Sequence, residues 1–239
     1  MSILYFDVET TSTGRDGAPV DVVLAVTRVD GIDTVWRETP FAAFSPETAV
    51  RLAIALTDHD GHVCTFNGAG FDFKVIAALL PADAGALRSK LVQVCFHGHV
   101  DIFFDYFTSV GYYASLESFC VGSNLAGKTW SGAESAAAVI AVLAETDNNL
   151  EREAVATRLA AYCAEDVACL ERLSDHVAKH SCLYRRAKSG RVSAWVPWLL
   201  TRFRTVAACL TEWQAHPVVA TWLSDPPPPP TTTVAWVVP

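Results

Sequence analysis

The sequence has no apolar run that approaches the roughly 18 residues needed to cross a membrane. Its N-terminus also lacks the charged-then-apolar layout of a secretory signal peptide, because Asp7 and Glu9 interrupt the first apolar stretch. Only 18% of the 239 residues are charged and 51% are hydrophobic, which excludes a disordered chain. We therefore expect a globular protein located inside the cell, in the cytoplasm, with no membrane partner.

A Cys-x-x-Cys pair is also missing, and the seven cysteines are an odd number. A disulfide framework uses an even number of cysteines, and a structural zinc site uses closely spaced pairs. Neither kind of site is predicted. We expect the thiols to be reduced and buried.

Charge is scarce and unevenly distributed. The net charge of −8 argues against broad, non-specific coating of nucleic acid. The segment from Lys179 to Arg204 nevertheless contains seven lysines and arginines and no acidic residue. A locally basic segment on an acidic protein is typical of a protein that holds a substrate strand at one place.

The hydrophobic pattern predicts strands first and helices later. We expect strands at 3–8, 20–30, 34–44, 62–66 and 92–96. We expect helices at 46–58, 71–80, 100–110, 115–121, 133–145 and 151–180. This order, with one α/β crossover, predicts an α/β fold in which helices flank a mixed β-sheet.

The composition changes near residue 180. We expect residues 1–180 to form one α/β domain and residues 181–239 to form a C-terminal extension that is basic, contains tryptophan and is rich in proline. Prolines 226–230 predict a stiff extended segment. The arginines and tryptophans of the extension could clamp a single strand by charge and stacking, or they could simply pack against the domain.

Two acids lie on the first predicted strand. Asp7 and Glu9 are two residues apart, so both side chains project from the same face, and Leu4, Phe6 and Val8 fill the opposite face. Neighbouring buried carboxylates repel one another unless a cation joins them. The alternative is that the strand ends early and both acids are solvated.

A third acid interrupts the apolar face of the long predicted helix. At roughly 100° per residue, Asp166 falls in the middle of a stripe formed by leucines and a valine. A carboxylate in this position needs a partner, because burying it alone costs several kcal/mol. Tyr162 lies one turn earlier on the same stripe. The partner could be a cation shared with other acids or an arginine or lysine in a structural ion pair.

A fourth acid, Asp72, opens the helix predicted at 71–80. Taken alone it could simply favour the helix dipole. Together, four acids on different elements can converge where strands end and helices begin. Oxygen ligands select hard cations such as Mg²⁺ or Mn²⁺, and two such ions about 4 Å apart suit in-line phosphodiester cleavage.

These residues resemble the motifs of a known family, the DEDD (DnaQ-like) 3′–5′ exonucleases. Residues 6–10, Phe-Asp-Val-Glu-Thr, resemble its first motif, and Asn67-x-x-x-Phe71-Asp72 resembles its second. Tyr162-x-x-x-Asp166 resembles the third motif in its tyrosine variant, DEDDy. The histidine variant would place histidine at position 161, where this chain has alanine. The resemblance covers roughly residues 1–180.

The resemblance implies a ribonuclease H-like fold and two divalent ions, Mg²⁺ or Mn²⁺. Asp7 would bridge both ions, while Glu9 and Asp166 would complete the site of the ion that activates water. Asp72 would serve the second ion, partly through water. Tyr162 would orient the attacking hydroxide. The implied reaction releases nucleoside 5′-monophosphates from the 3′ end of DNA or RNA.

The resemblance also implies contacts with the terminal nucleotide of a single-stranded 3′ end. Asn67 and Phe71 would shape its pocket, and the backbone of Thr10 could meet it. Lys128 could contact a substrate phosphate. Asp101 follows an apolar turn and could support the site, although a helix-capping role is the simpler interpretation.

Two other functions remain open on the sequence. The segment Gly122–Thr129 satisfies the P-loop formula G-x-x-x-x-G-K-T, which would cradle the phosphates of a nucleotide. A P-loop needs a preceding strand, but 116–121 is typical of a helix. The other alternative is a catalytically inactive nucleic-acid-binding module, which the presence of all four acids and Tyr162 does not favour.

Overall fold

A computed structural model describes residues 2–12, 20–39, 41–126, 139, 141–142, 145–197, 203–219 and 227–236. Its centre is a five-stranded mixed sheet with the order β3-β2-β1-β4-β5. The strands are β1 (Ser2–Thr10), β2 (Val22–Val29), β3 (Ile32–Trp36), β4 (Gly61–Thr65) and β5 (His99–Asp101). β1 pairs antiparallel with β2 and parallel with β4, and β4 pairs parallel with β5. The three parallel strands therefore end at the same edge of the sheet.

The hairpin between β2 and β3 follows the sequence directly. Asp30 and Gly31 both have positive φ, 50° and 76°. A two-residue turn with two positive φ angles matches the right-handed twist of paired strands, and an Asp-Gly pair suits it. The turn predicted at this dipeptide is confirmed.

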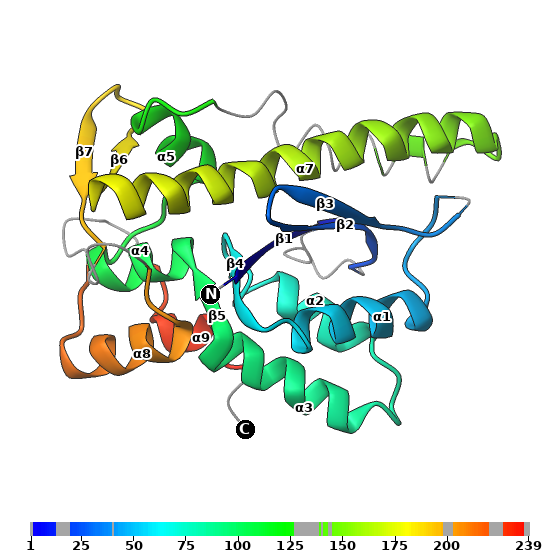
Figure 1. The fold of residues 1–239 in the computed structure, drawn as a ribbon, viewed down its shortest axis with the longest axis horizontal. Helices are drawn as coiled ribbons and strands as arrows, with labels where there is room; N and C mark the ends of the chain where they lie inside the picture. Colours follow the sequence, from blue (N-terminus) through cyan, green and yellow to red (C-terminus); the bar gives the residue numbers. More distant parts are fainter. Residues whose placement is uncertain are drawn as a thin grey trace.

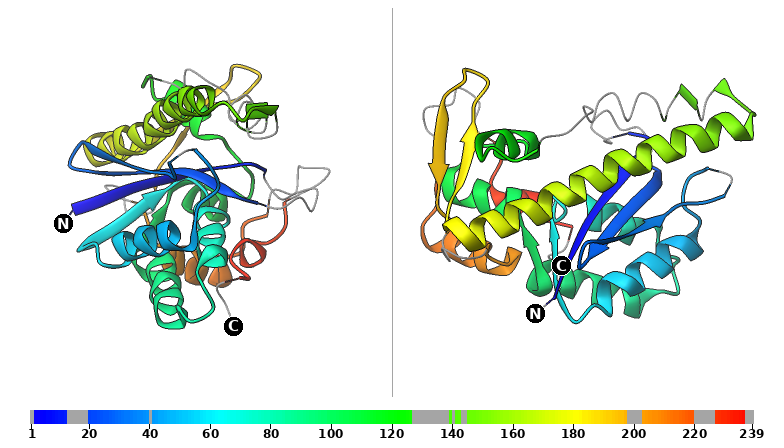
Figure 2. Two further views of the ribbon diagram at one scale, coloured as in Figure 1. Left: turned by 90° about the vertical axis from the view of Figure 1, so that its right-hand side faces the viewer. Right: turned by 45° about the horizontal axis from the view of Figure 1, so that its top comes forward.

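Helices cover both faces of the sheet (Figures 1 and 2). α1 (Pro46–Thr57), α2 (Asp72–Leu79) and α3 (Gly85–Gln93) lie on one face. The long helix α7 (Asn149–His180) crosses the other face, with α5 (Leu116–Gly122) beside it. α4 (Ile102–Val110) follows β5 directly. The predicted α/β fold, a mixed sheet flanked by helices, is confirmed.

The alternation of side chains along β1 separates two hydrophobic cores. Leu4, Phe6 and Val8 belong to the core beneath α1 and α2, whereas Tyr5 belongs to the core beneath α7. Asp7 and Glu9 continue the face of Tyr5, because strand side chains alternate. The face predicted for each of these side chains is confirmed, and both acids point toward α7.

Two predicted strands differ from the structure, and helix α3 was not predicted. The strand predicted at 92–96 is wrong, because α3 continues to Gln93 and a π-helical turn, η1 (Val94–Gly98), follows it before β5. The strand predicted at 34–44 ends at Trp36. Of the proline segment predicted to be extended at 226–230, the described residues 227–229 form neither helix nor strand, and only the last proline enters a short helix, α9 (Pro230–Thr233). The helix predicted at 133–145 lies largely outside the described residues.

The C-terminal extension packs closely on residues 1–180. Its hairpin, β6 (Leu183–Arg186) and β7 (Val192–Trp195), lies beside α5, and α8 (Val206–Ala215) lies beside α4. Trp195 is 6% exposed and packs edge-on against Tyr106. Arg204 is buried in an ion pair with Asp105. Trp195 and Arg204 therefore pack against the domain and do not clamp substrate. Trp198 lies outside the described residues.

No helix in the described part of the chain is both long enough and apolar enough to span a membrane.

Candidate active site

The predicted carboxylates gather at the edge where the parallel strands end. Asp7 and Glu9 lie near the end of β1, and Asn67 follows β4 by two residues. Asp101 is the last residue of β5. In open α/β sheets, this carboxyl edge is the usual place for a ligand, because the loops that leave the strands surround it.

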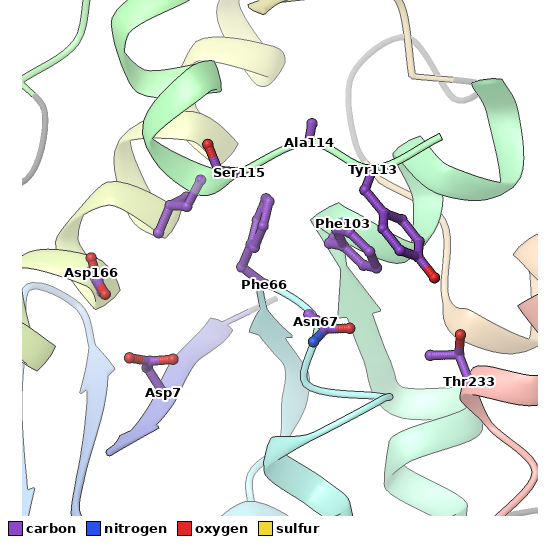
Figure 3. A pocket seen from close by; sticks show the side chains of 10 residues that line it. Asp7, Phe66, Asn67, Phe103, Tyr113, Ala114, Ser115, Asp166 and Thr233 are labelled. Atoms are coloured by element: carbon purple, nitrogen blue, oxygen red, sulfur yellow. The ribbon is translucent and has the colours of Figure 1, made fainter. Parts of the chain in front are cut away.

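α7 brings the third predicted motif to the same edge. Asp166 is 5% exposed and Tyr162 is 4% exposed, and they lie one helical turn apart. Figure 3 shows the carboxyl groups of Asp166 and Asp7 facing each other across one end of a pocket. The apolar stripe predicted around Asp166 is confirmed, because its leucines and valine all lie in the core beneath α7: Leu159, Leu170, Leu173 and Val177.

Cys163 lies on the same helix as Asp166 and contacts Asp7. Its Sγ is 3.5 Å from Asp7 Oδ2 and 3.6 Å from the Asp7 carbonyl oxygen. Burial raises the pKa of the Cys163 thiol, and the charges of Asp7, Glu9 and Asp166 raise it further. All three carboxyl groups are therefore close enough to act on this one thiol.

Asp72 reaches the cluster from the first turn of α2. It is 4% exposed, and its Oδ2 has no hydrogen-bond partner among the described residues. Burial raises the pKa of the Asp72 carboxyl well above its usual value, and the charges of Asp7, Asp101 and Glu9 add to this effect. The charges of Asp7 and Glu9 therefore act on both Asp72 and Cys163, and of the four predicted acids Asp7 and Glu9 have donor atoms within 4.8 Å of one another and of Cys163 Sγ.

This donor set fits hard divalent cations. The four carboxylates offer oxygen ligands only, which Mg²⁺ and Mn²⁺ prefer. A buried carboxylate whose oxygen lacks a donor is costly unless a cation compensates it. Asp72 is such a group, so its surroundings suit an ionised carboxylate only when positive charge is supplied from outside the chain.

A fifth acid, Asp101, organises the loop that follows β4. Its carboxylate accepts the backbone N–H of Asn67 at 2.8 Å, of Ala69 at 3.0 Å and of Phe104 at 3.0 Å. The last bond caps α4, so the capping role predicted for this residue is confirmed. Burial raises the pKa of Asp101 to about 6, although these hydrogen bonds oppose the rise. Asp101 thus positions the loop.

A pocket of about 650 Å³ extends from the carboxylates along the sheet edge. In Figure 3, Asp7 and Asp166 lie at one end, Asn67 near the middle and Thr233 at the other end. Asn67 has a φ of 70°, an uncommon value for a residue other than glycine. The remaining lining residues come from the segment just after β4, the start of α4, and the loop from α4 to the start of α5: Phe66, Phe103, Tyr113, Ala114, Ser115 and Leu116.

The C-terminal extension forms part of this pocket. Thr233 of α9 lines it, and the Trp236 indole N–H donates to the Ala69 carbonyl oxygen at 2.7 Å. A Cβ atom at Gly70 would lie 2.7 Å from Thr233 Cγ2, so glycine permits this close approach. The last described segment of the chain therefore bonds the same loop whose backbone N–H groups bond Asp101.

Only one of the residues predicted to contact substrate lines the pocket in the described part of the chain. Asn67 lines the pocket, but Thr10 and Phe71 are not among its described lining residues. The Thr10 hydroxyl donates to the Ser12 carbonyl oxygen at 2.7 Å, and Phe71 packs against the core beneath α1 and α2. Lys128 lies outside the described residues.

The P-loop alternative is not favoured by the described part of Gly122–Thr129. Gly122 ends helix α5, whereas a P-loop needs a strand before its first glycine. A Cβ at Gly122 would lie 2.2 Å from the Tyr184 carbonyl oxygen, so this glycine serves close packing between α5 and β6.

Sequence reasoning missed Cys163 and most of the pocket wall. Cys163 lies four residues after Leu159, three before Asp166 and seven before Leu170. Residues at these helical spacings share one face, so the pattern could have placed Cys163 on the buried stripe beside the acids. Phe103, Tyr113 and Thr233 come from separate segments. No short-range pattern links these segments, so their meeting depends on the tertiary fold.

Comparisons with known proteins agree with this architecture. A family model described as the RNase_H superfamily matches residues 4–178. No curated protein matches the sequence. The crystal structure of Trypanosoma brucei RNase D aligns with 99% of this chain and 74% of its own, with a TM-score of 0.53 and 13% identity. Its complex with RNA U12 aligns with 98% of this chain and 71% of its own, with a TM-score of 0.52 and 14% identity.

The family B DNA polymerase from the archaeon Pyrobaculum calidifontis aligns with 74% of this chain at 16% identity and a TM-score of 0.49. This chain spans about a quarter of the polymerase, since the alignment covers 24% of it. Identities this low bear on the fold alone. The predicted ribonuclease H-like fold is confirmed. On the match of residues 4–178, the chain belongs to the RNase_H superfamily.

Proposed function

We propose that this protein is a metal-dependent 3′–5′ exonuclease of the DEDD type, in its tyrosine variant. It would shorten single-stranded DNA or RNA from the 3′ end and release nucleoside 5′-monophosphates. The observation that supports this most strongly is that Asp7 of β1 and Asp166 of α7 line the same end of an open pocket, while Glu9 lies two residues from Asp7 on β1 and the charges of both act on the buried Asp72 of α2. The structure of T. brucei RNase D with RNA is consistent with such a substrate on this fold.

In this proposal, the four carboxylates hold two divalent cations, Mg²⁺ or Mn²⁺. When bound, such ions stabilise negative charge on phosphate oxygens and lower the pKa of water. Asp7 lies centrally, since its charge acts on both Asp72 and Cys163. Tyr162, one turn before Asp166, is the group that would orient the attacking water through its hydroxyl.

The pocket supports binding of a terminal nucleotide. Phe66, Phe103 and Tyr113 offer aromatic faces, and stacking on such faces tolerates every base. Asn67 offers an amide beside them, held in its left-handed conformation by the bond from its N–H to Asp101. Thr233 bounds the end of the pocket opposite the carboxylates (Figure 3). This arrangement suits a chain end better than a continuous strand.

The test uses 5′-labelled single-stranded DNA and RNA oligonucleotides with Mg²⁺ or Mn²⁺. We expect a ladder of shortening products that disappears with chelator and falls about 100-fold or more in Asp7→Asn, because metal catalysis contributes several kcal/mol. Asp83→Asn, an exposed acid in the turn before α3, serves as the matched control. Cleavage of a circular single strand, or release of the labelled 5′ nucleotide first, would contradict the proposal.

A further inference from the structure

Cys163 places a sulfur donor in direct contact with a candidate metal ligand, Asp7. Its Sγ lies 3.5 Å from Asp7 Oδ2. Cys163 Sγ and one oxygen each from Asp7 and Glu9 lie within 4.8 Å of one another. The helix α7 fixes the thiol there, because Cys163 is fully buried between the turns that present Tyr162 and Asp166. This contact is not used by the proposed hydrolysis.

The spacing of sulfur and oxygen matches a mixed thiolate–carboxylate metal site. Zinc binds sulfur at about 2.3 Å and carboxylate oxygen at about 2.0–2.2 Å, and it favours tetrahedral angles, so the two donor atoms should be about 3.6 Å apart. The observed separation of Cys163 Sγ and Asp7 Oδ2 is 3.5 Å. The donor atoms of Cys163 and Asp7 therefore need little movement to share one ion.

A second, independent group, Asp72, feels the charges of the same two acids. Asp72 Oδ2 is buried and has no hydrogen-bond partner in the described part of the chain. Besides burial, the charges of Asp7, Asp101 and Glu9 disfavour the ionised Asp72 carboxyl, so positive charge near Asp7 and Glu9 would relieve it. A buried acceptor in this state calls for a cation. Sulfur and carboxylate oxygens from α7 and β1 thus lie close enough to share one ion.

From this geometry we infer that Cys163 gives the site a second metal specificity. Thiophilic ions of the zinc group, Zn²⁺ and Cd²⁺, would bind through Cys163 together with Asp7 and Glu9. This inference rests on the proposed function, since it assumes that these acids bind metal. Mg²⁺ avoids sulfur and leaves the thiol in place, whereas a soft ion takes the thiolate and the thiol proton passes to solvent. Soft and hard ions then compete for the same carboxylates.

The experiment measures binding rather than nuclease activity. The full chain with Cys182→Ser is used throughout, because Cys182 is the one cysteine of the seven that is not buried. Cd²⁺ is titrated, and the thiolate-to-cadmium charge-transfer band is followed in the ultraviolet. Mn²⁺ binding is followed in parallel by electron paramagnetic resonance. Cys163→Ser removes the donor, and Cys209→Ser, a buried thiol on α8, is the matched control.

We expect one equivalent of Cd²⁺ to produce the band in the parent protein and in Cys209→Ser. In Cys163→Ser the band should be lost, and the ratio of Cd²⁺ to Mn²⁺ affinity should fall at least about 10-fold, because sulfur ligands select soft ions. Cys163→Ala replaces the serine variant if circular dichroism shows that serine unfolds the chain. If Mn²⁺ and Cd²⁺ both bind but Cd²⁺ produces no charge-transfer band, the proposed role of Cys163 is overturned, and the metal site of the proposed function is not. Failure of both ions to bind would instead overturn the metal site of the proposed function.

Discussion

The Asp72 carboxyl is buried beside Asp7 and Glu9, and its pKa is raised by burial and by those charges. Such a group destabilises the fold whenever no cation is bound, because either its ionised form is poorly solvated or it must hold a proton. At this residue, the proposed metal binding and the stability of the metal-free chain therefore oppose each other. Strain of this kind is expected where function selects the side chain.

Replacing Asp72 with asparagine separates these two effects. Without divalent ions, Asp72→Asn should increase the free energy of unfolding by about 1–2 kcal/mol, because it removes an ionisable group that burial disfavours. Saturating Mn²⁺ should stabilise the parent by about 2.7 kcal/mol at 100 times its dissociation constant, and the variant much less. Urea unfolding with and without Mn²⁺ measures both quantities.

The exposed acid Asp83 provides the control for this experiment, and Asp83→Asn should change each value by less than about 0.5 kcal/mol. If Asp72→Asn instead weakened the metal-free chain and kept the full response to Mn²⁺, Asp72 would be a structural acid and not a metal ligand.

Individual acids were predictable from the sequence when a regular element fixed their direction. The two-residue period of β1 placed Asp7 and Glu9 on one face, and the helical wheel placed Asp166 within a buried stripe. Thr233 was not predictable, because its approach to Gly70 depends on the path of the extension across the whole domain. Local periodicity gives direction, whereas contact between distant segments depends on tertiary packing.

At the scale of elements, the junction of β5 and α4 holds the loop after β4. Asp101 ends the strand, caps the helix and accepts two further N–H groups from the loop. One side chain therefore sets the relative position of three segments around the pocket. The same design makes the junction sensitive to pH, because burial raises the pKa of Asp101 to about 6.

The pH dependence has a definite sign. Asp101 binds its proton more tightly in the folded chain than in the unfolded chain, where its pKa is about 3.9. As the pH rises from about 4, the unfolded chain loses this proton first, so the free energy of unfolding decreases by about 3 kcal/mol until the pH passes about 6. Urea unfolding at successive pH values, with chelator present, should show this decrease.

Asp101→Asn removes the titrating group, so the difference between parent and variant isolates its contribution. We expect a flatter profile for the variant between pH 4 and 6, and we expect Asp83→Asn to follow the parent. Parallel profiles for the parent and Asp101→Asn would show that the Asp101 proton is bound equally in both states.

Elements were predictable where length and caps agreed with the hydrophobic pattern. α7 begins after Asn148, whose side chain accepts the Leu150 N–H, close to the start predicted at 151. The short apolar run at 92–96 was misassigned, because five residues cannot distinguish a strand from a buried helical turn by period. The hairpin of β6 and β7 was missed, since it is short and rich in charge.

At the scale of the whole molecule, the extension and the sheet share their cores. Val206, Cys209 and Leu210 of α8 lie in the core that contains Leu4 and Phe6 of β1. Trp195 of β7 lies in the core beneath α7. Because both cores include extension residues, we expect the described chain to unfold as one cooperative unit, with its active-site pocket dependent on residues far beyond 180.

The buried ion pair between Asp105 and Arg204 is the strongest polar link between α4 and the extension. Arg204 Nε and Nη2 donate to Asp105 Oδ1 at 2.8 Å and 2.6 Å, and the Arg204 backbone N–H donates to Oδ2 at 2.8 Å. The two side chains are 5% and 0% exposed. Loss of one partner from such a pair leaves an uncompensated buried charge.

Arg204→Met should therefore lower the free energy of unfolding by about 3–5 kcal/mol. Arg28→Met is the control, because Arg28 pairs with Asp33 and Glu171 at a more exposed site and its loss should cost about 1 kcal/mol or less. Circular dichroism, to which α7 is the longest contributing helix, and tryptophan fluorescence, which includes Trp195 of the extension, should report a single shared transition in both variants. Arg204→Met could instead show a separate early transition in fluorescence while the helical signal persisted. Residues beyond 180 would then be an independently unfolding unit. The pocket wall at Thr233 would be lost without loss of the carboxylate cluster.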